Sequence, residues 1–180
     1  MISSECGWRF IEAAPEDLSD KLIYGFYKQM THFSNGDRLS DTQVFSGSRR
    51  DGVGLGKSNT EKIVEKMDID GLAYSVYGNN KTTEKYAAKE CMDYSIVNDG
   101  ITFDDWFLPS DDELYHMLKN LGVNEIGLFD AVEYSGYWSS TEYDYRYSGG
   151  KTLYRYNPSS SSSFYQRDRK LSVRPVRYFI

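Results

Sequence analysis

The stretch Tyr137-Trp138-Ser139-Ser140-Thr141-Glu142 decides the fold, together with a second one near the end of the chain, Val173-Arg174-Pro175-Val176-Arg177-Tyr178-Phe179. Both mix aromatic and β-branched residues with polar ones, which is typical of half-buried strands. The interval between them, at about residues 141–170, contains Leu153 as its only aliphatic residue. Because it is so poor in Leu, Ile and Val, this interval cannot form a core, and we expect the two strands to carry it at the surface.

The 141–170 interval is rich in the residue types that adaptable binding surfaces use. Tyr combines a large contact area with few rotatable bonds, Ser and Asn offer adaptable hydrogen bonds, and Arg offers forked donors. We therefore predict a ligand-binding surface on a rigid scaffold. An ordinary solvent-facing hairpin region, with a low-complexity serine loop at 159–163, is the alternative that composition leaves open.

Length and charge limit the possible classes of protein. At 180 residues we expect a single domain, 1–180, and the net charge of −6 argues against nucleic acid as the main partner. No apolar run reaches the roughly 18 residues of a membrane span, and no signal peptide is visible. We expect Cys6 and Cys91 to be free, buried thiols, although the sequence also allows a disulfide between them. The two histidines do not suggest a zinc site.

The middle of the chain predicts helices. Ser110-Asp111-Asp112-Glu113 is the clearest capping box, Leu114 and Leu118 mark the core face that follows, and Gly122 is expected to end the helix. A second capping box is predicted at Ser58-Asn59-Thr60-Glu61. Another helix is expected to start at Thr82 or Thr83, with Ala87 and Cys91 on its buried face.

Strands are predicted at both ends of the chain, beginning with Trp8–Ala13. We expect the N- and C-terminal strands to be neighbours, which together with the central helices indicates an α+β fold. Asn98-Asp99-Gly100 and Gly149-Gly150 are predicted turns. The core is expected to contain the following residues: Trp8, Phe10, Leu114, Leu118, Trp138 and Val176.

Motifs for catalysis and metal binding are weak. The stretch Asp51–Ser58 resembles a phosphate-binding loop, but Asp51 stands where the first glycine is required. No G-x-S-x-G elbow or nucleophile–base pair is recognisable. The acidic clusters Asp104-Asp105 and Asp111–Glu113 could bind calcium, although helix capping explains the second one. We predict a protein that is not an enzyme and has no cofactor or metal site, with calcium left open.

Six segments, which span nearly the whole chain, carry a family resemblance. They are Gly7-Trp8-Arg9-Phe10-Ile11-Glu12-Ala13-Ala14-Pro15, Gly54-Leu55-Gly56-Lys57-Ser58-Asn59-Thr60, Ala87-Ala88-Lys89-Glu90-Cys91, Asp105-Trp106-Phe107-Leu108-Pro109-Ser110 with Glu113-Leu114, Tyr137-Trp138-Ser139-Ser140-Thr141-Glu142 and Val173-Arg174-Pro175-Val176-Arg177. In this order they resemble the bacterial collagen-like-protein C-terminal domain family. The similarity is greatest to members that serve as variable proteins of diversity-generating retroelements.

The resemblance implies a C-type-lectin-like fold, similar to that of formylglycine-generating enzymes, with paired terminal strands, two main helices and an irregular β-rich binding face. In such variable proteins, reverse transcription randomises template adenines and rewrites the codons before the terminal Arg-Pro-Val-Arg. Carried over to this chain, the ligand-facing stretches are Tyr143 to Tyr147, Tyr154 to Asn157 and Ser160 to Asp168. The individual candidates are Tyr143, Asp144, Tyr145, Arg146, Tyr147, Tyr154, Arg155, Tyr156, Asn157, Ser160, Ser162, Tyr165, Arg167 and Asp168.

The expected function is binding of a protein or glycan ligand through this hypervariable region, on a cell surface or a phage particle. A non-diversified adhesin or glycan-binding module of the same fold is the first alternative. A small enzyme that depends on Lys57 or Cys91 is the second. The ligand and the oligomeric state do not follow from the sequence.

Overall fold

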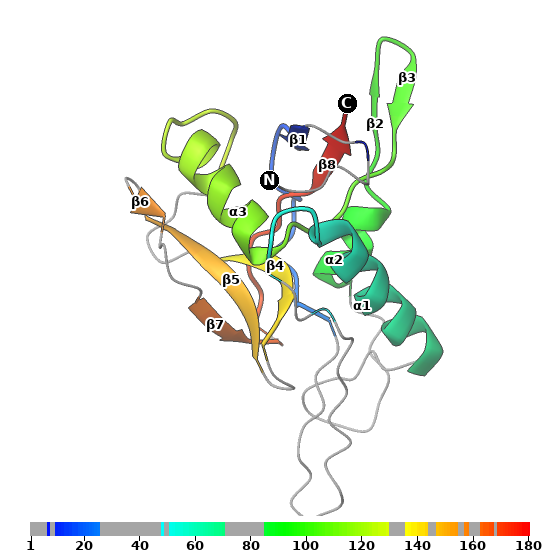
Figure 1. Ribbon diagram of the computed structural model, residues 1–180, viewed down its shortest axis with the longest axis vertical. Helices are drawn as coiled ribbons and strands as arrows, with labels where there is room; N and C mark the ends of the chain where they lie inside the picture. Colours follow the sequence, from blue (N-terminus) through cyan, green and yellow to red (C-terminus); the bar gives the residue numbers. More distant parts are fainter. Residues whose placement is uncertain are drawn as a thin grey trace, which may run out of the picture.

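The structure, a computed structural model, describes residues 7, 10–25, 48, 51–70, 85–129, 136–143, 147–154, 157–158, 163–167 and 169–180, with the backbone alone for 68–70, 147–154, 157–158, 163 and 166. The fold is a mixed α+β arrangement of helices and small sheets (Figure 1). Its elements are β1 (Phe10–Ala13), α1 (Gly56–Asp70), α2 (Ala87–Met92), β2 (Ile96–Asn98), β3 (Ile101–Phe103), α3 (Asp111–Met117), the π-helical turn η1 (Leu118–Gly122), β4 (Gly136–Glu142), β5 (Tyr147–Tyr154), β6 (Asn157–Pro158), β7 (Ser163–Gln166) and β8 (Val176–Phe179).

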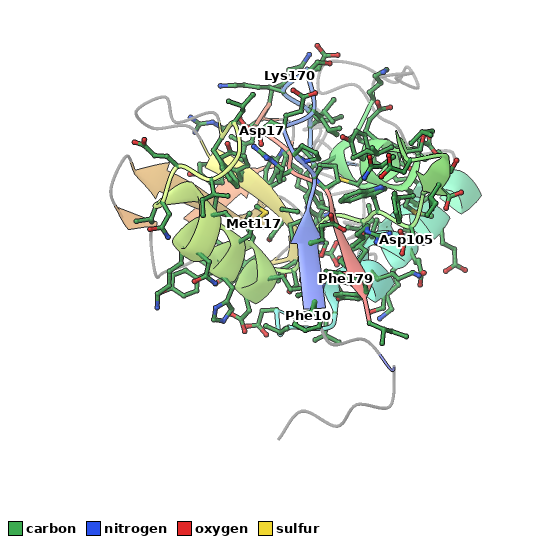
Figure 2. The ribbon with its side chains drawn as sticks, turned by 90° about the horizontal axis from the view of Figure 1, so that it is seen from above. Phe10, Asp17, Asp105, Met117, Lys170 and Phe179 are labelled. Atoms are coloured by element: carbon green, nitrogen blue, oxygen red, sulfur yellow. The ribbon has the colours of Figure 1, made fainter. Side chains whose placement is uncertain are left out.

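The two ends of the chain meet in one antiparallel ribbon. β1 pairs with β8, so that Phe10 lies opposite Phe179 and Ala13 opposite Val176. Figure 2 shows the two strands side by side, with Phe10 and Phe179 at the same end. Phe107 and Val176 also exchange backbone hydrogen bonds of 2.8 and 2.9 Å, which join β8 to the segment before α3. The predicted pairing of the terminal strands is therefore confirmed.

β4 is the strand on which the 141–170 interval rests. It pairs with β5, and β5 pairs in turn with β6 and β7. On its other side, the backbone amide of Trp138 donates to the carbonyl of Ser172 at 3.1 Å, and the amide of Ser172 donates to Gly136 at 3.0 Å. The buried indole of Trp138 donates to the carbonyl of Leu22 at 2.8 Å. β4 thus connects the interval to segments from both ends of the chain.

The core consists of two clusters of buried side chains. The larger lies between α1, α2 and β4, and the smaller lies between α3, β4 and β8. Leu114, Leu118, Trp138 and Val176 are fully buried, as predicted. The prediction for Phe10 is wrong, because its side chain is 56% exposed and stacks on Phe179 with ring centroids 5.3 Å apart. Trp8 lies outside the described residues.

The reason for the exposure of Phe10 is the alternation along β1. Ile11 and Ala13 pack against the smaller core cluster, so Phe10 and Glu12 occupy the outward face of the ribbon. The sequence indicates that two faces exist but not which of them meets the core.

The capping box at Ser110 is confirmed. The Ser110 hydroxyl accepts a hydrogen bond from the Glu113 amide at 3.3 Å, and Glu113 accepts one from the Ser110 amide at 2.8 Å. The capping box predicted at Ser58 is wrong, because α1 already begins at Gly56 and the Ser58 hydroxyl donates to the Leu55 carbonyl at 3.1 Å. α2 begins at Ala87 with Ala87 and Cys91 buried, while the predicted starts at 82 and 83 lie outside the described residues.

The predicted helix end at Gly122 is confirmed, but Gly122 does not form the left-handed cap that was expected there. The helix continues beyond Met117 as the π-helical turn η1, and the residues with left-handed backbone come later, at Glu125 (φ 55°) and Gly127 (φ 89°). The helix therefore ends in a wider turn than the left-handed cap that a glycine at that position predicts.

One of the two predicted turns forms. Asp99 and Gly100 connect β2 to β3 with φ angles of 49° and 78°, the positive values that a two-residue type I′ turn requires. The turn predicted at Gly149-Gly150 is wrong, because both glycines lie inside β5, where Gly149 pairs with Phe164 and Gly150 with Trp138. A glycine opposite an aromatic residue leaves space for the ring, so these glycines suit a strand here.

Arg174 joins the N-terminal segment to the end of the chain. Its buried guanidinium donates to Asp17 at 2.6 Å, to the Ala14 carbonyl at 2.9 Å and to the Leu128 carbonyl at 2.7 Å. The guanidinium also lies 3.9 Å from the ring centroid of Phe129. A carboxylate and two carbonyls thus take the place of the water that this charge loses on burial.

The side chain of Glu113 connects α3 to the start of α1 and to β8. Besides capping α3, its buried carboxylate accepts hydrogen bonds from the Gly54 amide at 2.7 Å and from the Tyr178 hydroxyl at 2.5 Å. Gly56 packs so closely that a Cβ there would contact the Glu113 carboxylate, the Phe107 ring at 2.8 Å and the Ser110 amide nitrogen at 2.9 Å. α1, α3 and β8 therefore meet at one carboxylate.

We predict that Gly56→Ala destabilises the protein by about 1–3 kcal/mol, because the added methyl group enters a space that is already filled. On helix propensity alone the change would stabilise α1 by up to about 1 kcal/mol, so the sign of the effect is diagnostic. Chemical denaturation measures it. Gly25→Ala is the control, since a Cβ there has Ile63 Cγ2 at an ordinary 3.6 Å. A Gly56→Ala protein as stable as the wild type would contradict the packing around Glu113.

A second prediction concerns alkaline pH. Burial and the charge of Glu113, together with their hydrogen bond, raise the pKa of Tyr178 well above its usual value of 10.0. A raised folded-state pKa contributes stability that is present below pH 10 and lost as the pH rises above it. The unfolding free energy should therefore fall above pH 10, and Tyr178→Phe should make this fall less steep, whereas the exposed control Tyr143→Phe should not. Equal pH dependence in all three proteins would contradict the role of Tyr178.

Candidate ligand-binding surface

The structure describes part of the predicted ligand-binding set. Side chains are described for Tyr143, Tyr165 and Arg167, and the backbone places Tyr147 and Tyr154 on β5 and Asn157 on β6. The remaining candidates lie outside the described residues: Asp144, Tyr145, Arg146, Arg155, Tyr156, Ser160, Ser162 and Asp168.

Tyr143 forms an exposed aromatic pair with Phe164. Their rings stack with centroids 3.9 Å apart, and their side chains remain 56% and 49% exposed. Tyr143 follows the end of β4 and Phe164 lies on β7, so the sheet brings together residues from the two ends of the interval. Phe164 was not singled out from the sequence, although strand alternation next to an inward Tyr165 would have pointed to it.

Tyr165 lies partly in the core. Its ring packs edge-on against Trp138 with centroids 5.9 Å apart, and a Cβ on Gly136 would lie 2.9 Å from it. The guanidinium of the exposed Arg169 lies 5.2 Å from the centroid of the same Tyr165 ring. Tyr165 is therefore only partly exposed, and its ring packs β7 against Trp138 of β4.

The prediction that Arg167 faces a ligand is wrong. Its side chain is fully buried and forms an ion pair of 2.7 Å with Glu142, which is also fully buried. The guanidinium lies 5.3 Å from the centroid of the Tyr24 ring. Tyr24 is tied to the same region, because its amide donates to the Arg167 carbonyl at 2.9 Å and its hydroxyl donates to the Ser140 carbonyl at 3.2 Å. A buried carboxylate at the end of β4 requires a cation beside it, and Arg167 supplies that charge.

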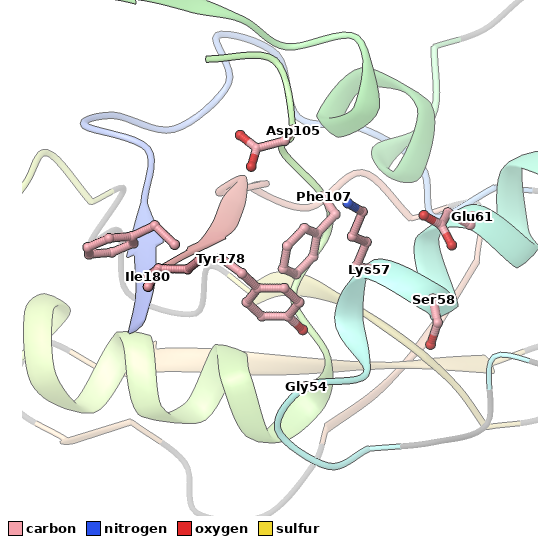
Figure 3. Close-up of a pocket in the computed structure, with 9 residues that line it drawn as sticks. Gly54, Lys57, Ser58, Glu61, Asp105, Phe107, Tyr178 and Ile180 are labelled. Carbon is pink, nitrogen blue, oxygen red and sulfur yellow. The ribbon is translucent and has the colours of Figure 1, made fainter. Parts of the chain in front are cut away.

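A pocket of about 450 Å³ opens on a different part of the molecule (Figure 3). Its described lining comes from the start of α1, the segment before α3 and the end of β8, and none of it belongs to the 141–170 interval. Lys57, Glu61 and Asp105 supply the charged groups, and the aromatic rings of Phe107 and Tyr178 form the inner wall. These side chains include no cysteine, serine–histidine pair or other activated nucleophile.

Cys91 lies in the larger core cluster and does not line this pocket. It is a buried free thiol, as predicted, while Cys6 lies outside the described residues. Burial raises the pKa of the Cys91 thiol well above its usual value, and the charge of Glu90 adds to this. Because the thiolate is the reactive form, Cys91 is unsuited to nucleophilic chemistry in this position.

The described acidic residues do not form a metal site. Among the residues that the structure describes, no group of three or more His, Cys, Asp and Glu side chains is arranged to bind a metal ion. In the cluster Asp111–Glu113, the Glu113 carboxylate is occupied by hydrogen bonds from the protein. Within the same described part of the chain, no helix is long and apolar enough to cross a membrane.

Comparison with known proteins returns no relative. No protein-family model matches the chain, and neither a curated protein nor a solved structure is significantly similar to it.

The buried ion pair leads to a prediction about stability. Arg167→Met should destabilise the protein by about 3–5 kcal/mol, because it leaves the Glu142 carboxylate buried without its cation. The double variant Glu142→Leu/Arg167→Met should recover most of this loss, since two apolar side chains of similar volume often replace a buried pair without cost. Chemical denaturation of both variants, with the exposed Arg169→Met as the control, measures the effect. A double variant that is no more stable than Arg167→Met would contradict a direct coupling between the two residues.

Proposed function

We propose that this protein is a ligand-binding protein with a C-type-lectin-like fold, and that it presents the 141–170 interval as its recognition surface. The observation that carries the proposal is the exposed pair of Tyr143 and Phe164 on a sheet whose inner strand is buried. Tyr and Phe are enriched in the binding surfaces of proteins. The ligand is a protein or a glycan.

Support for the proposal comes from the separation of structural and exposed residues. The frame consists of β1, β4, β8 and the three helices, and among the described side chains its core clusters draw few members from the interval. The partly buried Tyr165 is the one member of the interval that packs against these clusters in the described part of the chain. The remaining composition of the interval, rich in Tyr, Ser and Arg, suits adaptable contacts more than packing.

Within this proposal, the protein is a variable protein of a diversity-generating retroelement. Support comes from the residue types of the interval and from the six sequence segments around it. A near-copy of the 3′ end of the gene, differing mainly at adenines and lying beside a reverse transcriptase gene, would decide in favour of diversification. Its absence would favour a binding module of fixed specificity.

We predict that the double variant Tyr143→Ser/Phe164→Ser abolishes ligand binding while the fold survives. The loss of the stacked pair should cost less than about 1.5 kcal/mol in unfolding free energy. Binding should weaken more than about tenfold, as expected for aromatic residues at the centre of an interface. Arrays of immobilised glycans and of bacterial surface proteins, probed with wild type and variant, measure the binding.

The chain offers a matched control for this experiment. Phe10 and Phe179 form another exposed, stacked aromatic pair, and they lie on the terminal ribbon outside the interval. Phe10→Ser/Phe179→Ser should therefore retain binding. Binding that is lost in the control and kept in the Tyr143/Phe164 variant would place the recognition surface at the terminal strands and refute the proposal.

A further inference from the structure

Arg167 belongs to the predicted ligand-binding set but has no exposed surface with which to contact a ligand. We infer that Arg167 is a positioning residue, which closes the recognition surface against the frame and has to remain arginine when the rest of the surface changes. Specificity is then determined by residues 143–166, which lie between Glu142 and Arg167. This inference rests on the proposed function, because it divides the interval into replaceable and fixed positions.

The ion pair closes the interval at its base. Glu142 ends β4 and Arg167 directly follows β7, so their contact joins the two points at which residues 143–166 leave and re-enter the frame. Backbone hydrogen bonds reinforce both points from outside the interval. The Glu142 amide donates to the Ser48 carbonyl at 3.0 Å, and the Tyr24 amide donates to the Arg167 carbonyl at 2.9 Å.

The chemistry of the site favours arginine over other residues. The buried Glu142 carboxylate requires a charged donor, and the planar guanidinium also lies 5.3 Å from the centroid of the Tyr24 ring. Lysine carries the charge as a more strongly hydrated ammonium on a thinner stem, so it pairs and packs less well when buried. An uncharged residue would remove the buried guanidinium from beside the carboxylate.

The two exposed aromatic residues on the outer side of this closure carry no such constraint. Tyr143 and Phe164 are exposed, so replacing them removes the contact between the two rings but leaves no cavity in the interior. Arg169 is a matched comparison for Arg167, because it is the same residue type two positions later and is exposed over the Tyr165 ring. Rewriting the interval therefore affects recognition at one set of positions and folding at another.

Two yeast-display libraries test the inference. In both, residues 143–147, 154–157 and 160–165 are randomised together with 167 and 169, and the second library carries Glu142→Leu. Each library is sorted once for resistance to protease, without a target, and once for binding to lysozyme as the probe protein. Sequencing then compares the residues at 167 and 169 with the unsorted pools.

After the protease sort of the first library, arginine should be enriched several-fold at 167 and not at 169, because a loss of stability lowers the amount of folded protein displayed. In the Glu142→Leu library the preference for arginine at 167 should disappear and apolar residues should replace it. That reversal separates a requirement for the ion pair from a general requirement for a large side chain. Lysozyme binders should retain arginine at 167 and differ at the other randomised positions.

The outcomes distinguish the inference from the proposed function. Residue frequencies at 167 that stay the same as in the unsorted pool after protease selection would overturn the inference, even if binders emerge. Arginine enrichment that persists in the Glu142→Leu library would overturn it as well. Arginine enrichment at 167 with no lysozyme binder from either library would support the closure and count against a recognition surface in this interval.

Discussion

One buried carboxylate, that of Glu113, organises the frame of this protein. It accepts hydrogen bonds from Gly54, Ser110 and Tyr178, and so connects the loop before α1, the first turn of α3 and the last strand. α1 has no acidic residue in its own first turn, and Glu113 places negative charge beside its first residue, Gly56. Hydrogen bonds to a charged group contribute about 1.5–3 kcal/mol each, so several parts of the chain depend on this one side chain.

Two arginine sites extend the same principle to the rest of the frame. Arg174 joins the N-terminal segment to β8, and the Glu142–Arg167 pair joins the ends of the 141–170 interval to β4. In each case groups that are distant in the sequence contact a buried charge. These contacts hold the distant segments together without apolar side chains from the interval. The exposed pair of Tyr143 and Phe164 lies outside all of these networks, on the surface that we propose for recognition.

Several features determined by neighbouring residues could be predicted from the sequence, whereas most features determined by distant partners could not, with the pairing of the terminal strands as the exception. The capping box at Ser110 and the turn at Asp99-Gly100 depend on local geometry, and both form. The burial of Arg167 depends on Glu142, which no local pattern connects to it. The Gly149-Gly150 pair has the composition of a turn, but pairing with aromatic residues across the sheet places it inside β5. The alternation along β1 could be predicted, but the inward face is that of Ile11 and Ala13 and not that of Phe10.

The central claim is that a frame closed by buried charges carries a surface that contributes little to folding. Native-state hydrogen exchange tests this claim most directly. The amides of Phe107, Trp138 and Ser172, which are bonded within the frame, should exchange only through global unfolding. The backbone amides of β7, which precedes Arg167, should exchange through local openings that cost less free energy than global unfolding. Amides of β7 that are as protected as those of the frame would show that the interval belongs to the cooperative core, and would contradict the account.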